Sequence, residues 1–440
     1  MKRIATTTAA VLSLALAATA CSGGQNTTDS AGGTQELKGQ TVTVAAVWTG
    51  VEQANFKKVL DAFSAKTGAK TTFVSTGDNV STIIGSKIEG GNAPDVVMVP
   101  QLGVLQQFAR KGWLSPLSPQ IGTTVATNFA KAWKNYGTVD GTFYGLYFKG
   151  SNKSTVWYSP QALKDAGVTI PTSFEEMLTA AGSVSDSGLP AFAVAGEAGW
   201  PLTDWFENLY LSQAGPTHYD ELAQHKIPWT DPTVVKALTT LGRLFSNDRL
   251  MSGGRSGALQ TDFPESVNQV FGKTPKAGMV YEGDFVSGLI SGSLHKKVGQ
   301  DAKFFPFPAV TGGVKPVVGG GDAAVALKAG KNPKAAMKLI EFLAGPEAAG
   351  IWAKEGGYLS PNRKLDTSAY PDDTTRQTAQ SLVDAGDTVR FDMSDQAPAA
   401  FGGTQGSGEW KILQDFLRDP STPLKTAQAL ETAAAKAYKS

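Results

Sequence analysis

The sequence predicts an α/β protein with two lobes. Apolar, β-branched runs alternate with helical patterns over residues 41–99, which is typical of a parallel sheet covered by helices. The body of the chain is about 400 residues long, more than the roughly 250 to 300 residues at which a single core stops growing. No repeat of fixed period is visible, so a solenoid or a propeller is not expected.

The first strands and helices can be assigned in order along residues 41–100. TVTVAAVW (41–48) predicts a buried strand. The run 51–68 predicts a helix ending at Gly68, because four apolar residues recur at helical spacing: Phe56, Val59, Leu60 and Phe63. KTTFVST, NVSTIIGSKIEGG and APDVVMVP continue as strand, helix and strand. Right-handed crossovers make such a unit parallel, and ligands of open parallel sheets bind beyond the carboxyl ends of the strands.

The later elements are more mixed. Residues 143–150 and 154–160 are strand-like, and about 160–280 is mostly helical, with Thr172 and Glu175 at capping-box spacing. AGMVYEGDFVSGLI predicts a strand ending at a loop, with a helix after it. VKPVVGGGDAAVALKAG suggests two strands joined by a glycine turn, and amphipathic helices follow it.

The N-terminus has the pattern of a targeting segment. Residues 1–20 combine a basic start, an apolar run and small residues, and the run is too short to span a bilayer as a helix. Cys21, the only cysteine, follows directly in LALAATACSGG, and this context resembles the lipobox of bacterial lipoproteins, although Ala18 stands where that motif usually has leucine. The alternative is an ordinary signal peptide that leaves a free thiol. Residues 22–38 contain little apolar surface and predict a flexible tether.

Charge and motif content exclude several classes of function. Forty basic and 39 acidic residues give a net charge of +1, which is no electrostatic footprint for nucleic acid. FGKT (271–274) lacks the first glycine of a P-loop, because Val267 stands there. Motifs of metalloproteases, α/β-hydrolases and EF-hands are missing from the sequence, and its three histidines are not clustered. Neither a cofactor nor a metal is expected.

Seven motifs in order resemble one family. They are VWTG, GGNAPDVVMVPQ, MVYEGDF, FPFPAV, VVGGGDAAV, GPEAAGIWAKEGGYLSPN and RFDMSDQAPAAFGG. With them the chain resembles the carbohydrate-binding lipoproteins of bacterial ABC importers (solute-binding protein family 1), and within that family the α-glucoside-binding branch.

The resemblance implies a periplasmic-binding-protein-like fold, in which two α/β lobes close over a sugar in the cleft between them. We expect lobe 1 to comprise residues 39–150 plus about 283–330, and lobe 2 about 151–282 plus 331–440. The expected partners are an α-glucoside or other oligosaccharide, permease subunits of the importer, and the membrane through lipid on Cys21. The protein would be a monomer on the outer face of the cytoplasmic membrane.

Sugar binding calls for aromatic faces and for polar groups at strand ends. In the first lobe Trp48 ends the first strand and is a candidate stacking platform, or else a core tryptophan. Glu52 is placed to bind hydroxyls or to favour a helix N-terminus. Asp78 and Gln101 follow the second and third strands and are assigned to ligand contact, with helix capping as the alternative for Asp78.

The second lobe offers Trp200, which lies between glycine and proline and is assigned to stacking. Tyr281, Glu282 and Asp284 place one aromatic and two carboxyl groups at a strand end. A carboxylate pair is also the machinery of a glycosidase, so an enzyme using a pair such as Glu282 and Asp322 is the alternative function. A binder of amino acids, peptides or a metal is disfavoured by the aromatic-rich loops.

The remaining candidates lie toward the C-terminus. Gly320, Gly321 and Asp322 belong to a formal G-x-G-x-x-A pattern, but a strand rather than a helix follows, so we interpret the glycines as close approach to a sugar or as a plain hairpin turn. The family resemblance also implies cleft positions for Tyr358 and Arg363. Asp392 is a candidate for ligand contact or for a structural ion pair.

Overall fold

The computed structural model describes residues 35–385 and 389–439, so the predicted signal segment and Cys21 lie outside the described residues. Thr34–Ser440 make up one compact unit. The predicted tether ends earlier than Lys38, because Leu37 is buried in the core and its N–H donates to the Thr67 carbonyl at 3.0 Å. Across the described part of the chain, no helix combines the length and apolar character that crossing a membrane requires.

The larger sheet contains seven strands within the described residues. They are β1 (Thr41–Ala46), β2 (Lys70–Ser75), β3 (Val96–Val99), β4 (Leu114–Ser115), β7 (Gly145–Asn152), β12 (Val318–Leu327) and β13 (Arg390–Phe391). As predicted, β1 pairs in parallel with both β2 and β3. β12 is antiparallel to β3, β4 and β7, and parallel to β13.

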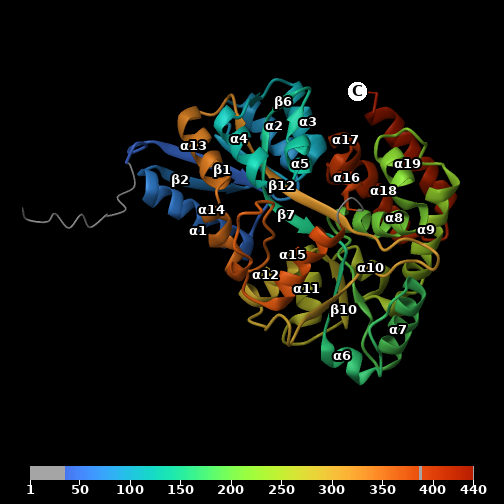
Figure 1. Cartoon of the computed structure of the whole chain (residues 1–440). Helices are drawn as coiled ribbons and strands as arrows, with labels where there is room; N and C mark the ends of the chain where they lie inside the picture. Colours follow the sequence, from blue (N-terminus) through green and yellow to red (C-terminus); the bar gives the residue numbers. More distant parts are fainter. Residues whose placement is uncertain (1–34, 386–388, 440) are drawn as a thin grey trace, which may run out of the picture. The chain divides into compact units, whose positions relative to one another are not determined.

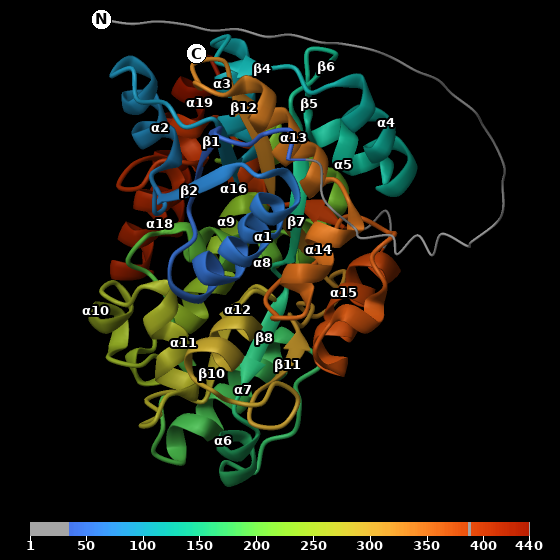
Figure 2. The ribbon, with the colours of Figure 1, turned by 90° about the vertical axis from the view of Figure 1, so that its left-hand side faces the viewer.

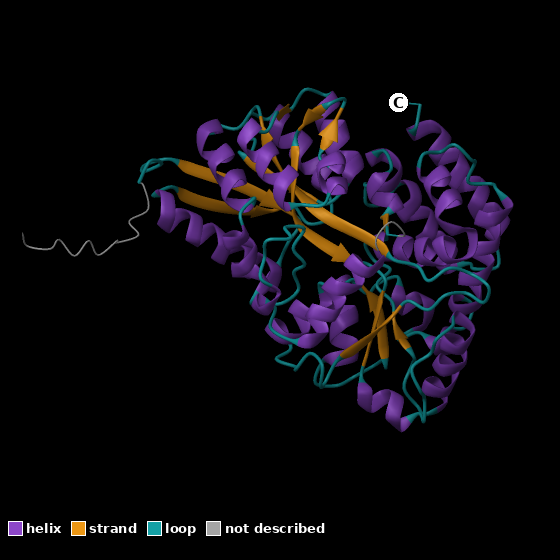
Figure 3. Cartoon of the chain, viewed as in Figure 1, coloured by secondary structure: helices purple, strands orange, loops and turns teal. Residues whose placement is uncertain are grey.

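The smaller sheet has the order β11-β8-β10-β9. Its strands are β8 (Thr155–Tyr158), β9 (Phe192–Ala193), β10 (Met279–Glu282) and β11 (Lys303–Pro306). A separate hairpin joins β5 (Thr138–Val139) to β6 (Thr142–Phe143). Figure 3 shows the two main groups of strands, each with helices around it.

The helices complete the α/β fold (Figure 1). Those of the first half are α1 (Gly50–Thr67), α2 (Val80–Glu89), α3 (Leu102–Arg110), α4 (Pro119–Asn128), α5 (Lys131–Tyr136), α6 (Pro160–Asp165), α7 (Phe174–Asp186) and α8 (Trp200–Ala223). Those of the middle are α9 (Pro232–Phe245), η1 (Asp248–Leu250), α10 (Gly254–Ala258), α11 (Phe263–Phe271), α12 (Val286–Gly288) and η2 (Leu289–Ser293). The last are α13 (Pro333–Leu343), α14 (Pro346–Ala353), η3 (Thr367–Ala369), α15 (Asp373–Ala385), α16 (Met393–Gln396), α17 (Ala399–Gly402), α18 (Gly408–Arg418) and α19 (Pro423–Ala437).

Side chains of the larger sheet alternate between two cores, as strand geometry requires. Val44 joins the core formed with α1, α13 and α14, whereas its neighbour Ala45 joins the core formed with α2 and α3. Figure 2 shows α1 lying beside α14. The predicted helix is confirmed in detail, because Phe56, Val59, Leu60 and Phe63 are the buried face of α1 and Gly68 ends it with φ of 76°.

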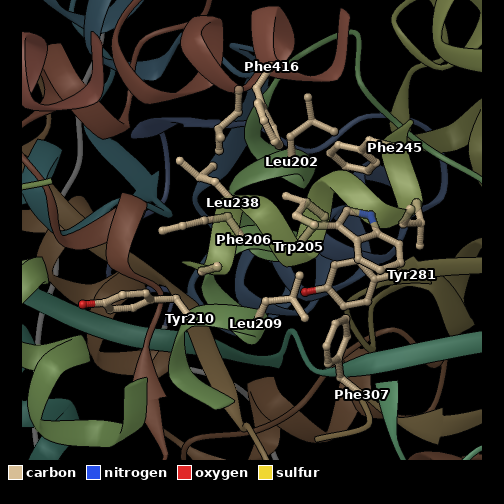
Figure 4. Close-up of a cluster of buried hydrophobic side chains, with 14 of the residues drawn as sticks. Leu202, Trp205, Phe206, Leu209, Tyr210, Leu238, Phe245, Tyr281, Phe307 and Phe416 are labelled. Carbon is tan, nitrogen blue, oxygen red and sulfur yellow. The ribbon is translucent and has the colours of Figure 1, made fainter. Parts of the chain in front are cut away.

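The smaller sheet shares a core with α7, α8, α9 and α16–α19. Figure 4 shows part of this core, where Trp205 and Phe206 of α8 lie among Tyr281, Phe307 and Phe416. Figure 1 shows the C-terminal helices α18 and α19 beside α8 and α9. α8 bends at Gly215, whose φ of 81° is not helical and which precedes Pro216.

The packing divides the chain differently from the predicted boundaries. We call the seven-stranded sheet with α1–α5, α13 and α14 the large-sheet lobe, and the four-stranded sheet with α6–α12 and α16–α19 the small-sheet lobe. Residues 333–353 were expected in lobe 2 but pack on the larger sheet, and β11 was expected in lobe 1 but pairs with β8. An apolar helix face does not specify which of two sheets it covers, so local pattern could not decide this.

The capping box of α7 is displaced by one residue. Its N-cap is Ser173, whose hydroxyl accepts from the Glu176 N–H at 3.2 Å. Glu176 in turn accepts from the Thr172 N–H and hydroxyl, both at 2.7 Å. The predicted pair, Thr172 and Glu175, therefore is not the one that forms, because Ser173 provides an equivalent hydroxyl one position later.

Candidate functional site

The chain crosses between the two sheets at Lys153 and Ser154, which connect β7 to β8. The Asn152 N–H donates to Asp284 Oδ1 at 2.6 Å, and the Asp284 N–H donates back to the Asn152 carbonyl at 3.0 Å. The Lys153 N–H donates to the Val318 carbonyl at 2.8 Å. Crossing segments from three parts of the sequence are thus joined by backbone hydrogen bonds, and the candidate site lies around this junction.

Lys149 of β7 provides a buried ammonium group beside the junction. Its Nζ donates to Glu52 Oε1 at 2.5 Å, and the side chain is 4% exposed. The same Nζ lies 5.7 Å from the ring centroid of Trp48, 5.5 Å from that of Phe285 and 5.2 Å from that of Trp352. Burial is the largest single influence and opposes the charge, but the carboxylates of Glu52, Asp322 and Asp284 together outweigh it and raise the pKa of Lys149. The ammonium is therefore charged at neutral pH.

Two carboxyl groups lie near this ammonium. Asp322 is the cross-strand neighbour of Lys149 in the β12–β7 ladder, and burial raises its pKa to about 6 although Lys149 opposes the shift. Burial also raises the pKa of Asp284 to about 7, against its hydrogen bond from the Asn152 backbone. Asp284 Oδ2 has no hydrogen-bond partner among the described residues. A buried acceptor without a partner is costly, so it favours a ligand that donates to it.

Asp78 and Trp200 meet from different lobes. Asp78 follows β2 in the large-sheet lobe, and Trp200 is the first residue of α8 in the small-sheet lobe. Burial and the charge of Glu197 raise the pKa of Asp78 to about 6, partly offset by a side-chain hydrogen bond with Trp200. The Trp200 ring is half-buried and lies 5.8 Å from Phe263 and 6.1 Å from Phe285 between centroids. Trp200 is thus more exposed than the other aromatic candidates, Trp48, Tyr281 and Tyr358, which are all buried.

Lys153 forms the second buried ammonium group, and sequence reasoning did not select it. It donates to Asp204 Oδ1 at 3.4 Å, to Asp395 Oδ2 at 3.3 Å and, most closely, to Asp392. Although burial opposes ionisation, Lys153 lowers the pKa of Asp392 to about 2, whereas burial and Asp392 raise that of Asp395 to about 7. The available signal for Lys149 and Lys153 was the presence of two lysines in FYGLYFKGSNKS, within and directly after an aromatic-rich strand.

Several candidates lie in the packed interior. Trp48 is 3% exposed and makes edge contacts with Phe56 and Trp352, both at 4.8 Å between centroids. Tyr281 packs 4.4 Å from Trp205 and donates from its hydroxyl to the Lys153 carbonyl at 2.7 Å, and it points into the core in Figure 4. Both rings serve packing in this structure.

The other aromatic and polar candidates differ in position. The Tyr358 hydroxyl donates to the Phe148 carbonyl at 2.8 Å, and its buried ring stacks on Trp352. Arg363 is exposed and donates to the Phe129 carbonyl at 3.0 Å, so it is anchored to the loop before α5. Gln101 is buried at the start of α3 and its Oε1 has no partner among the described residues.

The glycine cluster lies inside a strand and not in a turn. Gly319, Gly320 and Gly321 belong to β12, which runs unbroken from Val318 to Leu327. A Cβ on Gly321 would approach the Lys149 carbonyl to 2.6 Å, so the glycines allow β12 to lie against β7. The predicted glycine turn is therefore wrong, since the residues before it do not form a second strand of a hairpin.

The acidic residues of the junction could in principle hold a metal or perform acid–base chemistry. Carboxylate oxygens of Asp204, Glu207 and Asp392 lie within 4.8 Å of one another. Protein donors already serve them, because Lys153 binds Asp204 and Asp392, and the Met393 and Ser394 N–H groups donate to Glu207 at 2.6 and 2.9 Å. Both carboxyl oxygens of Glu282 are buried without a partner among the described residues, and burial raises its pKa well above the ordinary value.

The family of the chain distinguishes binding from catalysis. Residues 48–350 match the family described as bacterial extracellular solute-binding protein. The chain belongs to this family. This membership confirms the family resemblance. As a solute-binding protein of an ABC importer the chain is a binding protein and not an enzyme, so the glycosidase alternative loses its support.

Two curated relatives of this solute-binding protein exceed 30% identity. The osmoprotective compounds-binding protein GgtB of Synechocystis sp. is 32% identical over 374 residues, which cover 83% of this chain and 87% of the relative. The alpha-glucosides-binding periplasmic protein AglE of Rhizobium meliloti is 31% identical over 401 residues, with 88% and 85% covered.

Solved structures confirm the fold. The bacterial solute receptor AcbH aligns with a TM-score of 0.78 at 22% identity, covering 91% of this chain and 99% of that one. The GacH receptor of Streptomyces glaucescens aligns with a TM-score of 0.70 at 17% identity, covering 92% and 99%. The predicted two-lobed α/β fold is thereby confirmed.

Proposed function

We propose that this solute-binding protein captures an α-glucoside or a related oligosaccharide between its lobes and delivers it to the permease subunits of an ABC importer. The observation that carries the proposal is that a half-buried tryptophan occurs together with buried polar groups whose hydrogen-bonding capacity is incompletely used. A lysine ammonium has three N–H donors, and Glu52 accepts the only hydrogen bond that Lys149 makes to a described side chain. Asp284 Oδ2 lacks a donor, and the Trp200 ring is half-buried.

Sugar hydroxyls match this pattern, because each can both donate and accept while the ring offers an apolar face. In the proposal Lys149 donates to a sugar oxygen, Asp78, Asp284 and Asp322 accept from hydroxyls, and Trp200 stacks on the ring. Glu52 holds Lys149 in place. The alpha-glucosides-binding protein AglE, a relative with 31% identity, supports a ligand of the α-glucoside type.

The test is calorimetric titration of the purified protein with maltose, trehalose, sucrose and longer α-glucans, followed by chromatography of each sugar. We expect micromolar or tighter binding of one sugar, which is recovered intact. Trp200→Ala should weaken this binding. Trp113→Ala is the matched control and should not weaken it, because Trp113 is also half-buried but packs on Phe108, with 5.3 Å between the ring centroids. Absence of binding across the panel would refute the α-glucoside assignment.

We further propose that the protein is a monomer, anchored by lipid on Cys21 to the outer face of the cytoplasmic membrane. Several acyl chains on one residue support stable anchoring, since a single chain binds a membrane only marginally. Cys21→Ser should move the protein from the membrane fraction to the soluble fraction. A variant that stays with the membrane would contradict the anchor without affecting the sugar assignment.

A further inference from the structure

Lys153 occupies the point at which the crossing segments meet. It lies between the last residue of β7 and the first residues of β8, and 9% of its surface is exposed. Its neighbour Ser154 accepts from the Val318 N–H at 2.8 Å and donates to Asn208 Oδ1 at 2.6 Å. The backbone at this point is therefore fixed to β12 and to α8.

The ammonium of Lys153 joins two more elements. Asp204 lies in the second turn of α8, while Asp392 and Asp395 cap and open α16, directly after β13 of the larger sheet. Three carboxyl groups from two helices thus converge on one ammonium. Such an arrangement fixes the Nζ position far more closely than a single exposed ion pair would, because the charge is desolvated.

The fixed ammonium also faces the candidate stacking residue. Lys153 Nζ lies 5.5 Å from the centroid of the Trp200 ring, within the range of a cation–π interaction. Trp200 and Asp204 are four residues apart on α8 and therefore lie on the same side of that helix. Asp204 consequently draws the ammonium toward the helix face that carries Trp200.

We propose that Lys153 is a positioning residue that holds the Trp200 ring in its sugar-stacking orientation. Lys153 acts on the ring from the crossing segment, and Asp78 acts on it from the large-sheet lobe. The effect on affinity rests on the proposed sugar-binding function, whereas the effect on the ring does not.

The ring can be observed without any sugar by ¹⁹F NMR of protein labelled with 5-fluorotryptophan. The chain has nine tryptophans, and Trp200→Phe identifies the Trp200 resonance. In Lys153→Met we expect this resonance to shift and broaden while the other resonances stay in place, which also shows that the variant is folded. The control Lys164→Met removes an exposed lysine of α6 and should leave the Trp200 resonance unchanged. An unchanged Trp200 resonance in folded Lys153→Met would overturn the proposal.

Removal of Lys153 alone leaves buried carboxylates without their cation, which can prevent folding. In that case the double variant Lys153→Met/Asp392→Asn removes the ammonium together with the carboxylate that it approaches most closely. Asparagine keeps the N-cap of α16. The same shift of the Trp200 resonance is expected, and its absence in the folded double variant overturns the proposal.

The affinity measurement separates positioning from a purely structural role. Lys153→Met should weaken sugar binding by up to roughly thirtyfold, the full value of a desolvated cation–π contact. In a Trp200→Ala background the same substitution should have an effect of less than about twofold, because residues that act through each other are not additive. Additive losses, or unchanged affinity, would overturn the proposal. Failure of the unaltered protein to bind any α-glucoside would instead refute the proposed function and leave the NMR result to decide on Lys153.

Discussion

Replacement of Asp284 by asparagine should change how the stability of the protein depends on pH. Asp284 is 3% exposed, and its Oδ1 accepts from the Asn152 N–H while Oδ2 has no partner among the described residues. Asparagine can keep the Oδ1 hydrogen bond and carries no charge. The substitution therefore imitates the protonated carboxyl group at every pH.

The sign of the effect follows from the pKa of Asp284, which burial raises from 3.8 to about 7 in the folded protein. The folded state holds the proton more tightly than the unfolded chain does. Protonated Asp284 therefore contributes fully to the stability of the protein below the pKa that it has in the unfolded chain. This contribution is lost as the pH rises through the pKa of Asp284 in the folded protein. Between about pH 5 and about pH 8 the lost free energy of unfolding amounts to about 2.5 kcal/mol at 1.36 kcal/mol per pKa unit.

The assay is urea unfolding of both proteins at these two pH values without sugar. We expect the free energy of unfolding of the variant minus that of the wild type to be about 2.5 kcal/mol larger at pH 8 than at pH 5. Packing changes are the same at both pH values and cancel in this comparison. Asp248→Asn is the control, because Arg255 hydrogen bonds lower the pKa of Asp248 to about 2, so its titration lies below the tested range. Parallel pH dependences of wild type and Asp284→Asn would refute the reasoning.

Five further substitutions, one of them in a double variant, test the packing around the site. Lys149→Met should lower the free energy of unfolding by about 3 kcal/mol, because Glu52, whose side chain is only 16% exposed, loses its ion-pair partner. Lys149→Met/Glu52→Gln should regain much of this loss, and urea titration measures both variants. Trp352→Ala should cost about 3–5 kcal/mol because the ring is fully buried, whereas Trp200→Ala should change the thermal midpoint little and sugar affinity strongly. Gly321→Ala should cost about 1–3 kcal/mol, measured by the same titration, because the added Cβ meets the Lys149 carbonyl; an unchanged stability would show that β7 and β12 can separate.

The sequence was sufficient for the elements with strong periodicity. β1, α1 and β2 appear where the apolar, β-branched runs and the helical spacing predict them, and the parallel pairing of β1 with β2 and β3 follows from the handedness of crossovers. These features depend on local patterns of apolar residues, which can be recognised without knowing what lies across the sheet.

Prediction of the site was less complete, for a physical reason that Trp48 and Trp200 illustrate. Both are tryptophans at the end of a strand or loop. Trp48 is covered by Phe56 and Trp352, whereas Trp200 remains half-buried. The covering residues come from distant segments, so exposure is a property of the tertiary packing. Whether each of the predicted residues contacts a sugar stays a prediction.

By itself the sequence determined the α/β class, the family and the supply of aromatic and acidic side chains at strand ends. The tertiary structure decided which charges meet. Lys149 faces Asp322 because β7 pairs with β12, and Lys153 meets Asp204 and Asp392 because α8 and α16 pack together at the crossing segments. Such pairings join residues far apart in the chain, and only the packing of both sheets and their helices brings the charges close enough to interact.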